Sequence, residues 1–143
     1  MAQRFFLSLP VKDIARSRAF FAALGHEFDP QFTGDEAVCL TISDTASVMM
    51  LTCERYAQLC TKEIADTQKT SAALISLALG SRAAVDAHLD AAVQAGGAEA
   101  GEREDMGFMY SGGFYDLDGH GWGICWMNPE AAMPSDAPAE KRH

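Results

Sequence analysis

The chain has 143 residues, 48% of them hydrophobic, and a formal net charge of −9 at pH 7. This length supports one well-formed core, and an acidic chain without a Lys/Arg cluster excludes general affinity for nucleic acid or anionic membranes. No apolar run approaches the roughly 20 residues of a membrane span, and the N-terminus lacks a signal peptide's apolar core. The four cysteines have no paired spacing and lie mostly in apolar surroundings, which predicts reduced thiols in a cytoplasmic protein.

Residues 4–9 are rich in side chains that favour β-structure, and this segment predicts the first strand. Asp13 is suited to cap a helix over residues 14–24, and Gly25 is suited to end it. An extended return begins at residue 27 and is interrupted by Asp29-Pro30. The apolar segments 37–42 and 47–52 flank a turn at residues 43–45, which predicts a hairpin.

The second half repeats this order after a polar segment, residues 54–70, that predicts a linker with one or two helical turns. A strand over residues 74–79 leads to a helix over residues 82–95 and then to three extended segments. Pro-rich, polar sequence after Asn128 predicts a disordered tail. We therefore predict one domain over residues 1–128, with half-modules at about 4–53 and 72–128, a linker at about 54–71 and a tail at 129–143.

The order β-α-β-β-β thus occurs twice. A repeat of this length is too long for a solenoid unit and too short for an independent domain, so the halves are expected to share one core. The predicted fold class is α+β, with two βαβββ half-modules forming a curved eight-stranded sheet around a cleft. A ligand site is expected in that cleft.

Five short motifs, in this order, resemble the vicinal oxygen chelate superfamily, which includes glyoxalase I, extradiol dioxygenases and bleomycin-resistance proteins. They are Leu9-Pro10-Val11-Lys12-Asp13, Phe20-Phe21-x-x-Leu24-Gly25, Ala95-Gly96-Gly97, Gly107-Phe108-Met109-Tyr110 and Asp116-Leu117-Asp118-Gly119-His120-x-Trp122. The likeness covers about residues 4–128 and is nearest to glyoxalase-like proteins described as predicted lactoylglutathione lyases. It implies the paired-module fold and a homodimer.

The resemblance also implies positions for a divalent metal ion, which in this chain are Phe6, Met49, Leu74 and Gly123. None of these side chains offers the oxygen or imidazole ligands that such an ion needs, and shifting the register by one residue supplies none. Relatives with the last motif commonly place Glu where Gly123 stands. We therefore predict that the chain binds no metal and uses no other cofactor.

Strand alternation predicts which side chains line the cleft, because residues two apart share a face. The expected lining is Phe6, Ser8, Met49, Leu51, Leu74, Ser76, Gly123 and Cys125. Such a surface suits an apolar or aromatic small molecule, although the same side chains could equally fill the cleft as core. Phe108 and Tyr110 could close over its mouth as a lid, or be two packed aromatics of an ordinary hairpin.

Three further residues have a chemical and a structural interpretation. His120 is read first as a turn residue at a strand edge, with roles as a metal ligand or a general acid or base as alternatives. Cys125 has no activating base nearby in sequence and is read as a small pocket residue. Trp122 could stack on a ligand, but Phe20 and Phe21 favour a place for it in the core.

Three functions follow from these residues. The leading hypothesis is a metal-independent, homodimeric protein that binds an apolar or aromatic small molecule. The alternatives are a metal-dependent lyase or isomerase of the glyoxalase I type, and a dimeric accessory protein without a ligand. Metal content separates the first two, and thermal stabilisation by a ligand separates both from the third.

Overall fold

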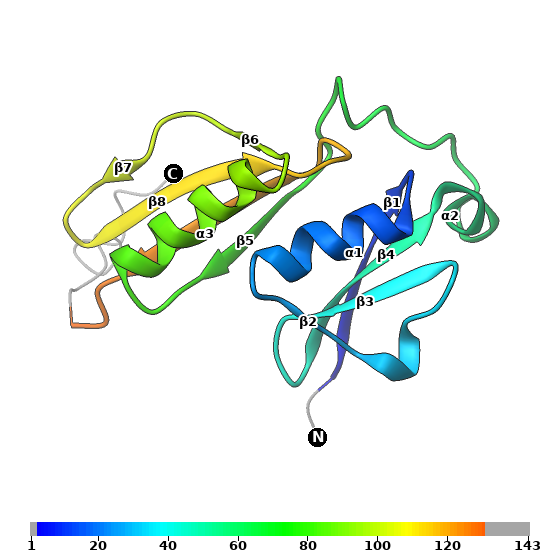
Figure 1. Ribbon diagram of the computed structural model, residues 1–143, viewed down its shortest axis with the longest axis horizontal. Helices are drawn as coiled ribbons and strands as arrows, with labels where there is room; N and C mark the ends of the chain where they lie inside the picture. Colours follow the sequence, from blue (N-terminus) through cyan, green and yellow to red (C-terminus); the bar gives the residue numbers. More distant parts are fainter. Residues whose placement is uncertain (1–2, 131–143) are drawn as a thin grey trace, which may run out of the picture.

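The computed structural model describes residues 3–130 and contains two β-sheets, each with one long helix against one face (Figure 1). The predicted tail at 129–143 therefore lies almost entirely outside the described residues. No helix in the described part of the chain is long and apolar enough to cross a membrane.

Sheet A belongs to the first module and has the strand order β1-β4-β3-β2. Its strands are β1 (Phe5–Val11), β2 (Glu27–Phe28), β3 (Ala37–Thr41) and β4 (Ala46–Thr52), with β1 parallel to β4 and the other pairs antiparallel. Helix α1 (Ile14–Ala23) begins where the Asp13 carboxylate accepts a hydrogen bond from the Arg16 N–H, and Gly25 follows it with φ of 94°. The caps predicted from sequence are confirmed.

Two short elements complete the first module. The 3-10 helix η1 (Pro30–Phe32) lies between β2 and β3, and the side chain of Asp29 accepts from the N–H of Gln31 at its start. Helix α2 (Cys53–Leu59) follows β4 directly and supplies the helical turns expected in the linker. Residues 60–73 then connect α2 to the second module without a helix or strand.

Sheet B belongs to the second module and has the order β5-β9-β8-β6, with β7 also paired to β8. Its strands are β5 (Leu74–Ala78), β6 (Ala98–Glu99), β7 (Glu104–Asp105), β8 (Met109–Tyr115) and β9 (Gly121–Met127). Helix α3 (Arg82–Gln94) begins where the Ser81 hydroxyl accepts from the Ala84 N–H. The pair of βαβββ modules predicted from sequence is confirmed.

The strand count differs in one respect from the predicted eight-stranded sheet. The extended segment after α3 is divided into β6 and β7, because Gly101 turns the chain between them with φ of 76°. In addition, no backbone ladder joins β1 to β5 among residues 3–130, so the strands form two sheets of four and five strands.

One core nevertheless serves both modules. Phe20 and Phe21 of α1 contact aromatic rings on the helix-covered side of sheet B, with centroid distances of 6.0 Å from Phe20 to Phe114 and 5.0 Å from Phe21 to Trp122. Each of these four residues is at most 2% exposed. Full burial of such a side chain contributes roughly 1.5–3 kcal/mol, so the modules stabilise one another, and the expectation that Trp122 belongs to the core is confirmed.

Candidate functional site

Each sheet has one face covered by its helix and one face turned away from the shared core, which we call the open face. In sheet A, the register places Phe6 beside Ser47 and Ser8 beside Met49 on the open face. The alternate residues Val48 and Met50 belong to the core.

The eight residues predicted to line one cleft fall on these two open faces, four on each. Phe6, Ser8, Met49 and Leu51 lie on sheet A, and Leu74, Ser76, Gly123 and Cys125 lie on sheet B. Alternation thus gives the correct face of each strand. The predicted lining is therefore divided between two open faces. The shared core covers the other face of each sheet.

The open face of sheet A is partly covered by the chain itself. The ring of Phe32, from η1, packs edge-on against Phe6 at 6.2 Å, and the guanidinium of Arg4 lies 4.9 Å from the Phe6 centroid. On the same face Leu51 is 5% exposed, whereas Phe6 remains 43% exposed. Part of this face is therefore packed interior, and its outer part is accessible.

The open face of sheet B is hollowed. A depression of about 470 Å³ extends over β5, β9 and β8 and reaches Ala100, Gly101, Glu102 and Glu104. Its base is side-chain-free at Gly113, Gly121 and Gly123. The side chains around this base include Leu74, Ser76, Glu104, Ser111 and Tyr115.

The glycines in this base differ in how much room they leave. A Cβ at Gly121 would lie 2.7 Å from Cδ2 of Leu74, and one at Gly113 would lie 3.0 Å from the Trp122 carbonyl oxygen. A Cβ at Gly123 would meet only Ser76, with its Oγ at 3.1 Å. The space above Gly123 is therefore open, and a flat ligand could approach the backbone there.

Cys125 lies beside this depression on the same face, paired in register with Ala78 and Ser111, and is half-buried. Phe108 precedes β8 and is also half-buried, and its carbonyl accepts a hydrogen bond from the Asn128 N–H.

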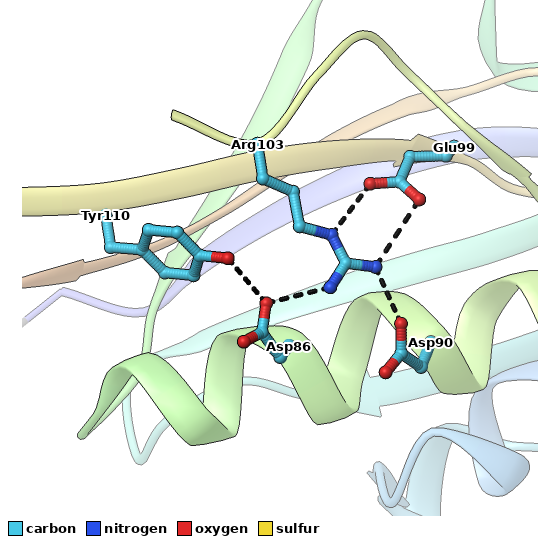
Figure 2. A network of polar contacts seen from close by, with 5 residues as sticks. All are labelled: Asp86, Asp90, Glu99, Arg103 and Tyr110. Carbon is cyan, nitrogen blue, oxygen red and sulfur yellow. Dashed lines mark hydrogen bonds and ion pairs between the residues drawn. The ribbon is translucent and has the colours of Figure 1, made fainter. Parts of the chain in front are cut away.

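Tyr110 does not lie on the open face, so its predicted place in the ligand site is wrong. Its register partners Asp105 and Trp126 point to the helix-covered side, and its hydroxyl donates to Oδ1 of Asp86 in α3 at 2.6 Å (Figure 2). The alternation rule itself predicts this, because Tyr110 is an even number of residues from the core residue Phe114. For Tyr110 these contacts fit the interpretation as a packed aromatic of a hairpin.

The same region contains a network that sequence reasoning missed. The guanidinium of Arg103 donates to Asp86 at 2.8 Å, Asp90 at 2.7 Å and Glu99 at 2.8 Å (Figure 2). Hydrogen bonds from Tyr110 and then Arg103 lower the pKa of Asp86. The sequence signal for this network was the four-residue spacing of Asp86 and Asp90, which places both carboxylates on one helix face. The network ties the β6–β7 connection to α3 and makes no contact with the depression on the open face.

The Asp116–His120 turn is likewise structural. The carboxylate of Asp118 accepts from the Lys12 N–H at 2.9 Å and from the Ser17 hydroxyl at 3.3 Å, which joins the modules. Nε2 of His120 lies 2.7 Å from the Pro10 carbonyl oxygen, an acceptor, so this nitrogen carries the proton. The structural interpretation of His120 therefore accounts for its position.

The buried carboxylate of Asp116 stabilises the same turn. It accepts from the indole N–H of Trp122 at 3.0 Å and from the backbone N–H groups of Asp118 and His120. Burial raises the pKa of Asp116 despite these donors.

The implied metal positions do not fit a metal ion. Phe6 and Met49 lie on one open face, Leu74 and Gly123 lie on the other, and none has a donor atom suited to a hard divalent cation. Among residues 3–130, no group of three or more His, Cys, Asp or Glu side chains is arranged to hold a metal.

Comparisons with known proteins agree with this fold. A family model described as bleomycin resistance protein-like N-terminal matches residues 3–43. Hypothetical protein SA1046 from S. aureus is similar in structure, with a TM-score of 0.73, 25% identity and coverage of 88% of this chain and 95% of that one. A comparison with curated protein sequences finds no match.

Two further solved structures share the fold at lower identity. A glyoxalase/bleomycin resistance protein/dioxygenase family enzyme from Burkholderia phytofirmans PsJN has a TM-score of 0.74, 15% identity and coverage of 88% of this chain and 99% of that one. A glyoxalase-related enzyme from Fulvimarina pelagi has a TM-score of 0.71, 18% identity and coverage of 88% of both chains.

Proposed function

We propose, from the chain's resemblance to the vicinal oxygen chelate superfamily, that it binds an apolar or aromatic small molecule on its open sheet faces without using a metal ion. The observation that carries this proposal is the depression on sheet B, where the open space above Gly123 lets a flat ligand lie against the backbone. Leu74 and Tyr115 supply apolar contact beside it, and the hydroxyls of Ser76 and Ser111 supply polar anchors.

The proposed binding uses no metal ion because of the side chains at the implied metal positions. Phe6, Met49, Leu74 and Gly123 replace the ligands that metal-binding relatives carry, and apolar side chains cannot compensate a bare divalent charge. The chain's own residues can therefore bind, orient and shield a ligand. The cysteines are free thiols, which supports the cytoplasmic location that we also propose.

A homodimer would complete the site. The open faces expose large apolar side chains, including Phe6 at 43%, Leu74 at 72% and Tyr115 at 45%. A second copy that placed its sheet A face opposite sheet B of the first would cover these side chains and bring the two halves of the predicted lining together. Two-fold symmetry would then produce two equivalent clefts.

Binding of the aromatic fluorophore anilinonaphthalene sulfonate, an anion with apolar rings, compared between the wild-type protein and Gly123→Trp, tests the proposal. An indole at position 123 would occupy the depression, so we expect saturable binding to the folded wild type and its loss in the variant. Equal binding by both folded proteins would contradict the proposed location. Absence of binding, and of thermal stabilisation by aromatic ligands, would favour an accessory protein.

A further inference from the structure

A second hollow lies between the modules, at a place that the proposed function does not use. It has a volume of about 350 Å³ and is enclosed by β1, the start of β5, the turn before β9 and the linker at residues 60–73. We call it the seam hollow. Its apolar wall comprises Leu7, Leu9, Pro10, Ile64, Ala73 and Ile75.

Specific hydrogen bonds hold the linker over this hollow. The Thr67 hydroxyl donates to the Asp118 carbonyl at 2.6 Å, and the Gln68 amide donates to the Leu117 carbonyl at 3.2 Å. Figure 1 shows the linker passing from α2 across to β5. The hollow is therefore bounded by a segment that follows α2 of the first module and is hydrogen-bonded to the turn before β9 in the second.

The free edge of β1 presents backbone polar groups to the seam hollow. The Phe5 N–H bonds to the Thr45 carbonyl in the β4 direction, so residues 5, 7, 9 and 11 direct their peptide groups to β4. Ser8 and Pro10 direct theirs away from β4. Pro10 has no N–H, and its carbonyl oxygen is occupied by His120.

Ser8 is left with an N–H and a C=O side by side on this edge. Within residues 3–130 neither group has a hydrogen-bond partner, and Ser8 lines the seam hollow. One donor and one acceptor in this arrangement match a ligand edge that offers one acceptor and one donor. A secondary amide in a cis arrangement, as in a lactam ring, has such an edge.

The charge around the hollow favours a neutral ligand. Lys62 and Glu63 are the only Lys, Arg, Asp or Glu residues in its lining, and their charges are opposite. An apolar wall with this balance disfavours an ion, because burial of an uncompensated charge is costly.

We propose that the seam hollow is a second small-molecule site, for a compact, neutral, apolar compound with a lactam-like amide edge. The amide C=O accepts from the Ser8 N–H, the amide N–H donates to the Ser8 C=O, and the hydrocarbon ring contacts Leu9 and Ile75. Such a ligand would contact strands of both modules and the linker, and would stabilise their association.

Titration of the isotope-labelled full chain with ε-caprolactam, monitored by the NMR signal of the Ser8 amide, tests this site. We expect a saturable shift of that signal, and we expect N-methylcaprolactam, which has lost the donor, to bind at least about tenfold more weakly, a difference of roughly 1.4 kcal/mol. Equal affinity for the two compounds, or no shift at Ser8, would overturn the proposal.

Two variants on the linker locate the binding. Ala73→Trp should fill the hollow and remove the shift, and Ala65→Trp, on another part of the lining, serves the same purpose if the first variant does not fold. Gly123→Trp is the matched control, because it fills the depression on sheet B and should leave lactam binding unchanged. Loss of lactam binding in Gly123→Trp alone would assign the ligand to the open face and refute the seam site.

Discussion

The Nε2 atoms of His26 and His88 lie 3.0 Å apart, where the end of α1 meets α3. One of the two nitrogens must carry a proton and the other must accept it, so the accepting ring is neutral. The lowered pKa of each histidine favours the neutral form of the donating ring as well. Nδ1 of His88 is buried without a partner. We infer that His88 donates from Nε2, because its buried Nδ1 is then an unprotonated acceptor and no N–H is left unsatisfied.

This pair predicts that stability falls in mild acid. Burial, and then the nearby His26, lower the pKa of His88 from 6.5 to about 4, and burial lowers the pKa of His26. Because the unfolded chain binds the proton more tightly, the stabilising contribution of neutral His88 is complete above pH 6.5. It is lost as the pH falls from 6.5 toward 4, by up to about 1.4 kcal/mol per pH unit.

Urea unfolding of the wild type and of His88→Gln between pH 8 and pH 4.5 measures this contribution. Gln cannot titrate but can still donate to His26, so the free energy of unfolding of the variant should depend less steeply on pH below 6.5. Above pH 7 the two curves should run parallel. Equal slopes below pH 6.5 would mean that the pair does not control acid sensitivity.

Local chemistry made much of this fold predictable from sequence. Asp13 caps its helix as predicted, and Ser81 caps α3 in the same way, because short polar side chains satisfy the first free N–H groups of a helix. Alternation also identified the open-face residues of β1, β4, β5 and β9. Each of these predictions depends on neighbours along the chain.

The features that sequence reasoning missed depend on residues far apart in the chain. Separation of the two sheets follows from how Phe20 and Phe21 pack against the second module, which no local pattern encodes. Arg103 meets Asp86 only after α3 has packed beside β8. The seam hollow similarly requires the linker's hydrogen bonds to the turn before β9.

Tyr110→Phe tests the corrected position of Tyr110. The substitution removes the hydroxyl that donates to Asp86, so the free energy of unfolding should fall by about 0.5–1.5 kcal/mol. Binding of anilinonaphthalene sulfonate should not change, because this ring lies on the helix-covered side of sheet B. Weakened binding at unchanged stability would restore Tyr110 to the ligand site.

Purified, untagged protein should contain no stoichiometric Ni, Zn, Fe or Mn, because Phe6, Met49, Leu74 and Gly123 offer no suitable donor atoms. Elemental analysis checks this expectation. About one ion per chain, lost in His120→Ala, would support the glyoxalase I-type alternative and contradict a metal-free site.

Light scattering at micromolar concentration should give twice the chain mass of 15.4 kDa. The exposed side chains of Phe6, Leu74 and Tyr115 are the physical reason, because a closed two-fold association would bury them. Leu74→Lys places a charge on this surface and should shift the protein toward the monomer. A wild-type monomer under these conditions would mean that neither open face is an interface.

Gly123→Trp distinguishes a ligand depression from packed core by its effect on thermal unfolding. A Cβ at this position meets only Ser76, whose hydroxyl 3.1 Å away can rotate, so the indole can extend into the depression. We therefore expect a folded protein with a nearly unchanged melting temperature.

Gly112→Trp is the matched control on β8, because its Cβ would lie 2.6 Å from Cδ1 of the core residue Leu89. Overpacking of that kind costs about 1–3 kcal/mol or more, so this variant should melt well below the wild type. If Gly123→Trp is destabilised as strongly as Gly112→Trp, the space above Gly123 is part of the packed interior and the open face of sheet B does not bind a small molecule.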